Sequence, residues 1–300
     1  MIRLGLLDFD TSHVVAFSQR LNHQGVPQAQ WVEGARVVIG CPGQSELAPQ
    51  RIPGYVEEIK KLGIPLVEKP TDMIGKIDGL LLCSLEGGVH LERAIPFLEK
   101  GIPLFIDKPF TCGRKDALAL AELSRKHNTP VFSSSSLRYA EEVVRLLADT
   151  PPEERVGAAT WGPASLSEMP GKNPGLFHYG IHAAEMLYAL MGPGCVRVQA
   201  IHQKETDQVT GIWSDGRIGT LRGLRTGNQG FGLTLFSKKA IKSQGVGTGT
   251  IYRELLKKMV IFFQTKKAPV DLAETVELMA FLEAANSSAA NHGTVVELPK

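Results

Sequence analysis

The chain has 300 residues, of which 43% are hydrophobic and 21% are charged, and its formal net charge is +2. These values are typical of a globular protein long enough for two domains. The small net charge and the lack of a long basic block argue against a nucleic-acid or membrane-surface role, and no apolar run reaches the ~18 residues of a membrane span. Because the amino terminus also lacks the apolar core of a signal peptide, we expect a cytoplasmic protein.

Strands and helices are predicted to alternate through the first part of the chain. Short apolar runs predict buried parallel strands, and amphipathic stretches predict helices. The predicted strands are residues 2–7, 35–39, 79–83, 102–106 and 131–134. The predicted helices are residues 11–22, 55–61, 90–100, 117–127 and 140–147. This alternation indicates an α/β protein whose residues 1–136 form a Rossmann-type, doubly wound parallel sheet.

The pattern changes after Pro151 and Pro152. Successive β runs interrupted by Gly and Asp predict a mostly antiparallel sheet. These runs are residues 196–203, 208–213, 217–224 and 230–237, and helices are predicted at 252–265 and 272–290. We therefore assign residues 137–300 to an α+β substrate and oligomerisation domain. Because only two helices follow to cover the sheet, its open face is expected to pair with another copy in a homo-oligomer, a dimer or a tetramer.

One charged turn follows a strongly apolar strand. Residues 101–114 read GIPLFIDKPFTCGR, so Asp107 and Lys108 leave the predicted sheet at its carboxyl edge, where open α/β folds bind ligands. Pro109 disfavours the helical conformation for the residue before it, which keeps the chain extended up to the lysine. From these residues alone, Lys108 fits a ligand-facing role and a solvated ion pair with Asp107 equally well.

The sequence Ile-Asp-Lys-Pro at residues 106–109 resembles the Glu-Lys-Pro signature of the Gfo/Idh/MocA family (glucose-fructose oxidoreductase / inositol dehydrogenase), with Asp in place of Glu. His90 lies upstream at the spacing that this family shows between a loop histidine and the signature acid. Residues 136–139, 215–220 and 272–290 also fit the family, so the likeness covers nearly the whole chain. It implies a dinucleotide-binding domain for NAD or NADP and a sugar-like small-molecule substrate.

The phosphate-binding turn departs from that family. Asp8, Asp10 and His13 stand where its G-x-G-x-x-G glycines would lie. Glycine lets the backbone approach a pyrophosphate at a helix N-terminus, whereas each carboxylate at ~5 Å, with an effective dielectric of about 20, opposes the anion by ~3 kcal/mol. We therefore expect weaker dinucleotide binding than in a relative with the full glycine motif. Asp8 and Asp10 also fit helix capping, or contact with a metal or sugar hydroxyls.

A second expected contact with the dinucleotide is also altered. The acid expected after the second strand, which would bind the adenosine ribose, is replaced by Gly-Cys-Pro-Gly at residues 40–43. The sequence therefore does not distinguish NAD from NADP as the cofactor. The cofactor-binding residues that the resemblance implies are Asp8, Asp10, Thr11, His13, Ser84, His90, Lys108 and Pro109. For His90, a capping role in the same loop fits nearly as well.

A second cluster lies at residues 177–185, FHYGIHAAE, where a predicted helix would place His178, His182 and Glu185 on one face. The family's Asp-x-x-x-His dyad falls here, with His182 at its histidine and His178 at its aspartate. The resemblance implies that Lys108, His182 and His178 form the catalytic set, with His182 as acid and base. Losing the aspartate would weaken His182 as a base.

Two other interpretations of this cluster stay open. A His-x-x-x-His pair with a carboxylate suits zinc or manganese, but the intervening Glu of H-E-x-x-H is missing. A core histidine is the other, above all for His178. The four cysteines show no C-x-x-C spacing, so we expect reduced thiols and no metal site.

These features predict an oxidoreductase that moves hydride between a nicotinamide and a sugar or polyol, in a cleft between the domains. Lys108 would polarise the reacting oxygen and His182 would exchange its proton. The alternatives are a cofactor-independent or metal-assisted sugar lyase or epimerase, and a non-catalytic sugar-binding or scaffolding protein. Asp8, Asp10 and His13 favour the alternatives, whereas the joint presence of Lys108 and His182 favours chemistry.

Overall fold

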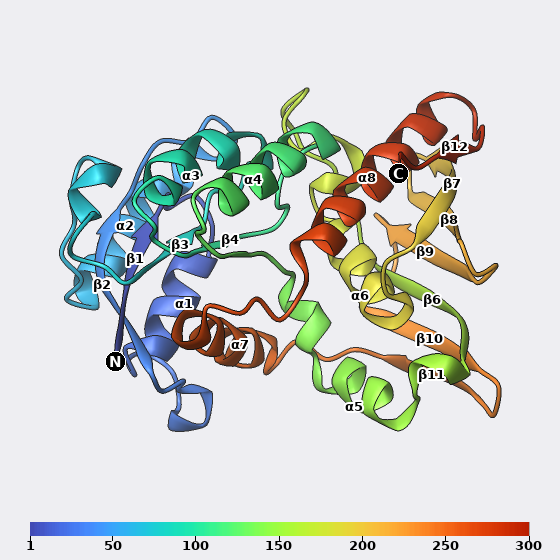
Figure 1. Ribbon diagram of the computed structural model, residues 1–300, viewed down its shortest axis with the longest axis horizontal. Coiled ribbons are helices and arrows are strands. Elements are labelled where there is room, and N and C mark those ends of the chain that lie inside the picture. The colour runs from blue at the N-terminus through green and yellow to red at the C-terminus, as the bar shows by residue number, and fades with distance from the viewer. Residues whose placement is uncertain (300) are drawn as a thin grey trace. The chain divides into compact units, whose positions relative to one another are not determined.

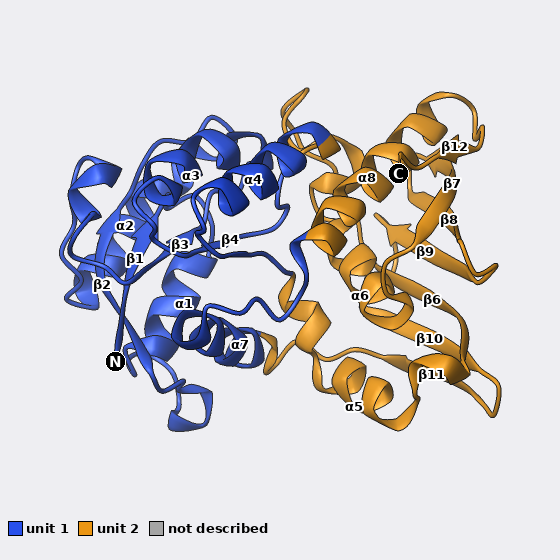
Figure 2. Cartoon of the chain, viewed as in Figure 1, with its two compact units in different colours: residues 1–111, 115–134, 252–272 blue, residues 112–114, 135–251, 273–300 orange. Residues whose placement is uncertain are grey.

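The computed structural model describes residues 1–299, which form two compact units (Figure 2). Unit 1, blue in Figure 2, comprises residues 1–111, 115–134 and 252–272. Unit 2, orange, comprises residues 112–114, residues 135–251 and the chain from Ala273 onward. Apart from residues 112–114, the chain first passes from unit 1 into unit 2 between Ser134 and Ser135.

Unit 1 is built on a five-stranded parallel sheet in the order β2-β1-β3-β4-β5 (Figure 1). The strands are β1 (Ile2–Leu7), β2 (Ala35–Cys41), β3 (Gly79–Leu82), β4 (Leu104–Ile106) and β5 (Val131–Phe132). Leu66 forms an isolated parallel bridge with Gly40 of β2. The predicted Rossmann-type sheet is therefore confirmed, and its strand order reverses direction between β1 and β3, where such folds bind ligands.

Helices cover both faces of this sheet, α1 and α7 on one and α3 and α4 on the other (Figure 1). Their bounds are α1 (His13–Leu21), α2 (Ile52–Lys61), α3 (His90–Leu98), α4 (Arg114–Lys126) and α7 (Ile251–Thr265). Because both faces are covered, β3 and β4 are buried at every position, which explains their uninterrupted apolar sequences.

Helix α7 belongs to unit 1, whereas the sequence placed it in the second domain. The Phe262 ring lies 5.7 Å from that of Phe132 on β5, and Phe263 packs so closely on Gly79 that a Cβ there would lie 2.4 Å from its ring. Both phenylalanines are fully buried. The chain thus returns to unit 1 near its carboxyl end because these rings complete its core, a connection that a single boundary near residue 137 did not anticipate.

Unit 2 contains a seven-stranded sheet in the order β11-β10-β6-β9-β8-β7-β12. Its strands are β6 (Arg155–Pro163), β7 (Cys195–Gln203), β8 (Thr206–Trp213), β9 (Ile218–Leu224), β10 (Gly232–Ser237), β11 (Ile241–Gly245) and β12 (Val296–Glu297). All neighbours pair antiparallel except β6 and β9, which are parallel. The predicted mostly antiparallel sheet is therefore confirmed.

Strand β6 was not predicted from the sequence, although it lies inside the sheet between β10 and β9. Its sequence, RVGAATWGP, is rich in Gly and Ala and lacks a strong β pattern. The structure gives the reason, since a Cβ at Gly157 would lie 2.6 Å from the Ile218 carbonyl oxygen on β9. Close packing between the two parallel strands excludes a larger side chain at that position.

Three helices complete unit 2: α5 (Glu141–Asp149), α6 (Ile181–Met191) and α8 (Leu272–Ala290). Helix α6 is buried almost throughout and packs on the sheet, where the Thr160 hydroxyl of β6 donates to the Ala183 carbonyl oxygen at 2.9 Å. The rings of Tyr188, Trp213 and Phe281 pack together between α6, the sheet and α8. Among residues 1–299, no helix combines the length and apolar character needed to cross a membrane.

Candidate functional site

The carboxyl end of β4 holds a buried pair of charged residues. Asp107 and Lys108 follow the strand directly, and both are buried. The His13 Nδ1 atom lies 2.5 Å from Asp107 Oδ2, and Asp107 Oδ1 accepts from the Lys108 backbone N–H at 2.8 Å. Burial works to raise the pKa of Asp107, but His13 and Lys108 outweigh it and the pKa lies below its ordinary value. Burial lowers the pKa of the Lys108 ammonium, while Asp107 and Asp10 act in the opposite direction.

Asp8 follows β1 in a left-handed conformation, with φ of 65°. Such a conformation favours glycine, which supports the alignment of Asp8 with the first glycine of the nucleotide-binding motif. The Ser84 hydroxyl donates to Asp8 Oδ2, and the Arg93 Nε atom lies 3.5 Å from the same oxygen. Burial raises the pKa of Asp8 to about 6, although Ser84 and Arg93 counteract part of that rise.

The altered loop after β2 packs directly on Asp8. A Cβ at Gly43 would lie 1.8 Å from Asp8 Oδ1, so only glycine fits there beside the carboxylate. The Asp8 backbone N–H donates to the Cys41 carbonyl oxygen at 3.0 Å, and the Phe9 N–H donates to that of Pro42 at 2.9 Å. The turn at Asp8 and the loop at residues 40–43 therefore form one structural unit. The loop leaves space for the Asp8 carboxylate and accepts the backbone hydrogen bonds of the turn.

Asp10 points toward the loop after β3. Its Oδ1 atom accepts from the Leu85 backbone N–H at 2.9 Å, and burial raises its pKa. The N-cap of α1 is Ser12, and no acid lies in the first turn of that helix. The interpretation of Asp8 and Asp10 as helix caps is therefore wrong, because their carboxylates accept hydrogen bonds from Ser84 and Leu85 in the loop after β3.

The other predicted cofactor residues in unit 1 also lie at this edge. The Thr11 hydroxyl accepts from the His13 backbone N–H at 3.5 Å. His90 is fully buried, and its two ring nitrogens each lie 3.0 Å from a carbonyl oxygen, that of Phe110 for Nδ1 and that of Ser84 for Nε2. Burial lowers the pKa of His90. Its contacts hold the loop after β3 against the loop that follows Lys108 and Pro109.

His182 lies in the first turn of α6 and is 5% exposed. Its Nδ1 atom lies 2.7 Å from the Ser135 hydroxyl oxygen. The Tyr179 and Phe231 rings approach the imidazole at steep angles, with centroids 4.7 Å and 5.9 Å away. Ser135 was not predicted as a site residue, because it is one of four consecutive serines, residues 133–136, and no local pattern distinguishes it from the others.

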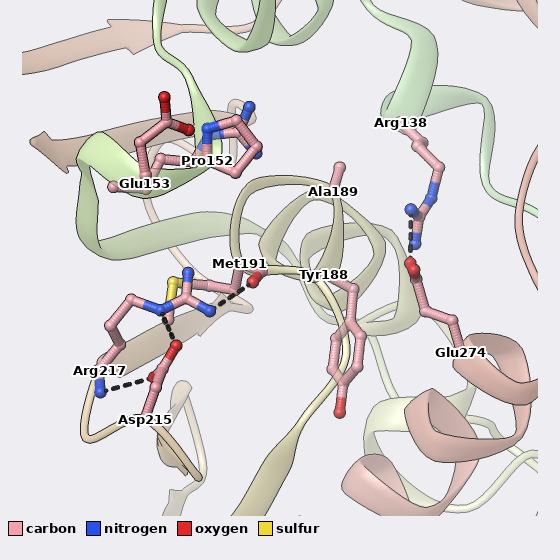
Figure 3. A pocket seen from close by; sticks show the side chains of 11 residues that line it. Arg138, Pro152, Glu153, Tyr188, Ala189, Met191, Asp215, Arg217 and Glu274 are labelled. Atoms are coloured by element: carbon pink, nitrogen blue, oxygen red, sulfur yellow. Dashed lines mark hydrogen bonds and ion pairs between the residues drawn. The ribbon is translucent and has the colours of Figure 1, made fainter.

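Glu185 follows His182 by one turn and is part of a buried ion-pair network. Its Oε1 accepts from the Ser135 backbone N–H at 3.0 Å, and its Oε2 accepts from Arg138 Nε at 2.8 Å. The Arg138 Nη1 atom also lies 2.7 Å from Glu274 Oε1, at the wall of a cavity of about 500 Å³ (Figure 3). Burial lowers the pKa of Arg138, but Glu185 and Glu274 outweigh it and raise the pKa above its ordinary value.

The predicted common face of His178, His182 and Glu185 is wrong for His178. A 3-10 turn at Gly175–Phe177 precedes it, and α6 begins only at Ile181. The Glu185 carboxylate accepts from the Ser135 backbone N–H and from Arg138 Nε. Within residues 1–299, no group of three or more His, Cys, Asp or Glu side chains is arranged to bind a metal ion.

Comparison with known proteins supports the fold. No protein-family model matches the chain, and no curated protein does. Among solved structures, myo-inositol 2-dehydrogenase from Lactobacillus plantarum is similar over 99% of both chains, with 16% identity and a TM-score of 0.79. GenD2 from gentamicin A biosynthesis, in complex with NAD, is similar over 100% of this chain and 97% of its own, with 14% identity and a TM-score of 0.80. An oxidoreductase from Agrobacterium radiobacter, in complex with NAD+, L-tartaric acid and magnesium, is similar over 99% and 98%, with 14% identity and a TM-score of 0.75.

Proposed function

We propose that this protein is an NAD(P)-dependent oxidoreductase that acts on a hydroxyl or carbonyl of a sugar or polyol. The observation that carries the proposal is Lys108, a buried lysine with a lowered pKa directly after β4, beside an aspartate that is paired with His13. A lysine that protein surroundings hold near a reacting oxygen can polarise it. The similar solved structures, which include a myo-inositol dehydrogenase and two proteins in complex with NAD, support the same reaction class.

In this proposal, the chain's own side chains handle the substrate oxygen and its proton. The Lys108 ammonium polarises the oxygen, and the His182 imidazole takes the proton during oxidation and returns it during reduction. Ser135 and Glu185 hold His182 and its surroundings in place. A nicotinamide bound to the chain would supply the hydride chemistry. His178 is left without an assigned step, since it lies outside α6.

The fit of a dinucleotide to the turn after β1 is mixed. Asp8 keeps the glycine-like backbone conformation that such a turn needs. Asp10, however, adds a carboxylate close to the start of α1, where the pyrophosphate of a doubly wound fold rests. We therefore propose that Asp10 opposes the cofactor's charge and that the affinity is lower than a full glycine motif would give.

Calorimetric titration with NAD+, NADH, NADP+ and NADPH tests the proposal directly. We expect heat of binding for at least one of the four, followed by reduction of that cofactor in the presence of myo-inositol or a related polyol. A chain that is folded by circular dichroism yet binds none of the four would contradict the proposal. That outcome would favour a sugar-binding protein without redox chemistry, which is the alternative that Asp10 supports.

We further propose that unit 2 pairs with another copy of itself through the open face of its sheet. On β9, Gly219 faces Leu187 of α6, so the neighbouring Ile218 faces the other side. Ile218 is 52% exposed, and Phe236 and Ile201 on the same sheet are 39% and 56% exposed. Exposed apolar side chains along one sheet face are typical of an interface between subunits.

A further inference from the structure

We infer that Ser135 is the positioning residue of His182. Its hydroxyl holds the imidazole through Nδ1, and in the proposed reaction Nε2 would be the nitrogen that exchanges a proton with the substrate. The catalytic meaning of this inference rests on the proposed function, but the contact itself does not. Neither residue pattern nor resemblance pointed to Ser135, which the resembled family's motifs do not include.

The contact is short and buried. The Ser135 Oγ atom lies 2.7 Å from His182 Nδ1, and the two residues are 0% and 5% exposed. The Leu137 backbone N–H donates to the same hydroxyl oxygen at 3.1 Å, which fixes the direction in which Oγ points. A hydrogen bond of this length in a buried setting orients the ring more strongly than one exposed to water.

Helix α6 holds Ser135 at two points. His182 contacts its hydroxyl, and Glu185, one turn further along the helix, accepts from its backbone N–H at 3.0 Å. Arg138 donates to the second oxygen of Glu185 at 2.8 Å and prevents that carboxylate from turning away. Ser135 and His182 therefore keep one relative position, because the same helix determines both.

A serine partner has a chemical consequence for an acid and base. A hydroxyl can accept from Nδ1–H or donate to a bare Nδ1, whereas a carboxylate only accepts. A base needs a bare Nε2, so Nδ1 carries the proton of the neutral ring, and the Ser135 hydroxyl accepts from Nδ1–H both before and after a proton arrives at Nε2. The ring therefore need not move during the proton transfer. A neutral hydroxyl also leaves the imidazolium without the compensating charge that an aspartate would provide.

Nuclear magnetic resonance of the full chain, labelled with 15N-histidine, tests the inference without any substrate. The His182→Gln variant assigns the His182 signals, and Ser135→Ala and Ser135→Gly remove the hydroxyl. We expect both substitutions to change the 15N shifts of the two His182 ring nitrogens and the pH at which the ring titrates. The matched control is Ser136→Ala, an adjacent buried serine that is 3% exposed. It should leave the His182 signals where they are.

The result that would overturn the inference is a folded Ser135→Ala or Ser135→Gly protein whose His182 signals and titration match the unchanged chain. Having two variants keeps the test decisive if alanine prevents folding, since glycine adds no atom beside α6. Where the chain shows dehydrogenase activity, Ser135→Ala should lower kcat at least ~10-fold and leave KM nearly unchanged, because a misplaced ring affects the chemical step. Loss of cofactor binding in the calorimetric titration would instead count against the proposed function alone.

Discussion

His13 Nδ1 lies 2.5 Å from Asp107 Oδ2, which joins the turn after β1 to the strand end that carries Lys108. The sequence predicts that His13 stands where the third glycine of a nucleotide-binding motif would lie. Its ring also stacks on Phe17 and meets Tyr252 edge-on. The contact with His13 leaves Asp107 paired in the folded protein.

Replacing Asp10 should strengthen dinucleotide binding. The Asp10→Gly variant is expected to raise the affinity for NAD(H) about 10-fold or more, because removing one like charge at ~5 Å relieves ~3 kcal/mol, part of which solvent already screens. The double variant Asp8→Gly with Asp10→Gly should bind at least as tightly. Calorimetry gives the dissociation constants, with Glu122→Gln on the exposed part of α4 as control. Unchanged affinity in both variants would mean that the turn carboxylates do not face the phosphates.

Asp8 should make the protein less stable as the pH rises. Burial raises its pKa from 3.8 to about 6, so between these values the folded state keeps a proton that the unfolded chain releases. The free energy of unfolding contributed by Asp8 is therefore highest below about pH 4, falls up to about pH 6 and is constant above. Asp8→Asn should remove this loss and stabilise the protein by about 1–3 kcal/mol above pH 6. Urea denaturation at several pH values checks this, and an unaltered pH profile in the variant would contradict it.

Lys108 and His182 should act as a unit. Lys108→Ala and His182→Ala are each expected to lower kcat by about 10²–10⁴-fold, with the double variant little worse than either single one. Steady-state kinetics on the polyol that gives turnover measure this. The His182→Ala variant should still bind the dinucleotide that the unchanged chain binds. Losses that multiply in the double variant would indicate that the two residues contribute to separate steps.

Removing Arg138 should destabilise unit 2 strongly. Arg138→Met leaves the buried Glu185 without its ion-pair partner, and we expect a loss of about 3–5 kcal/mol in the free energy of unfolding. Adding Glu185→Gln should recover part of that loss, because it removes the unpaired charge. The control is Arg197→Met, which removes a solvent-exposed ion pair on β7 and should change the free energy of unfolding little. Equal losses in Arg138→Met and Arg197→Met by urea denaturation would show that the network contributes no special stability.

The exposed face of the unit 2 sheet should control assembly. Sedimentation velocity at micromolar concentration is expected to show a dimer or a tetramer, and Ile218→Glu should shift it toward the monomer. Ile261→Glu is the matched control, since Ile261 on α7 is also 52% exposed but lies in unit 1. An unchanged chain that sediments as a monomer would contradict the proposed pairing.

Much of the fold could be predicted from local patterns. The strands β1 and β3 and the helix α8 agree with their predicted spans to within one residue, because each is a strongly apolar run that begins or ends at an aspartate, namely Asp8, Asp78 and Asp271. Strand β6 of the second sheet could not be predicted in this way. Its residues are mostly small, and the reason for Gly157 is the close carbonyl oxygen of Ile218 on β9. His178 was placed on the wrong element because the helical spacing was extended across a turn that begins α6 late.

The sequence by itself determined the doubly wound sheet, the antiparallel second sheet and the place of Lys108 at a strand end, because these follow from the period of apolar residues and from Pro109. Only the tertiary structure decided which partners the polar side chains take. Ser135 joined His182, His13 joined Asp107, and Glu185 joined Arg138 across 47 to 94 residues of chain. Such pairs depend on how distant elements pack, and a local pattern carries no information about them. The return of α7 to unit 1 has the same cause, since buried rings on β5 and α7 meet only once both elements are folded.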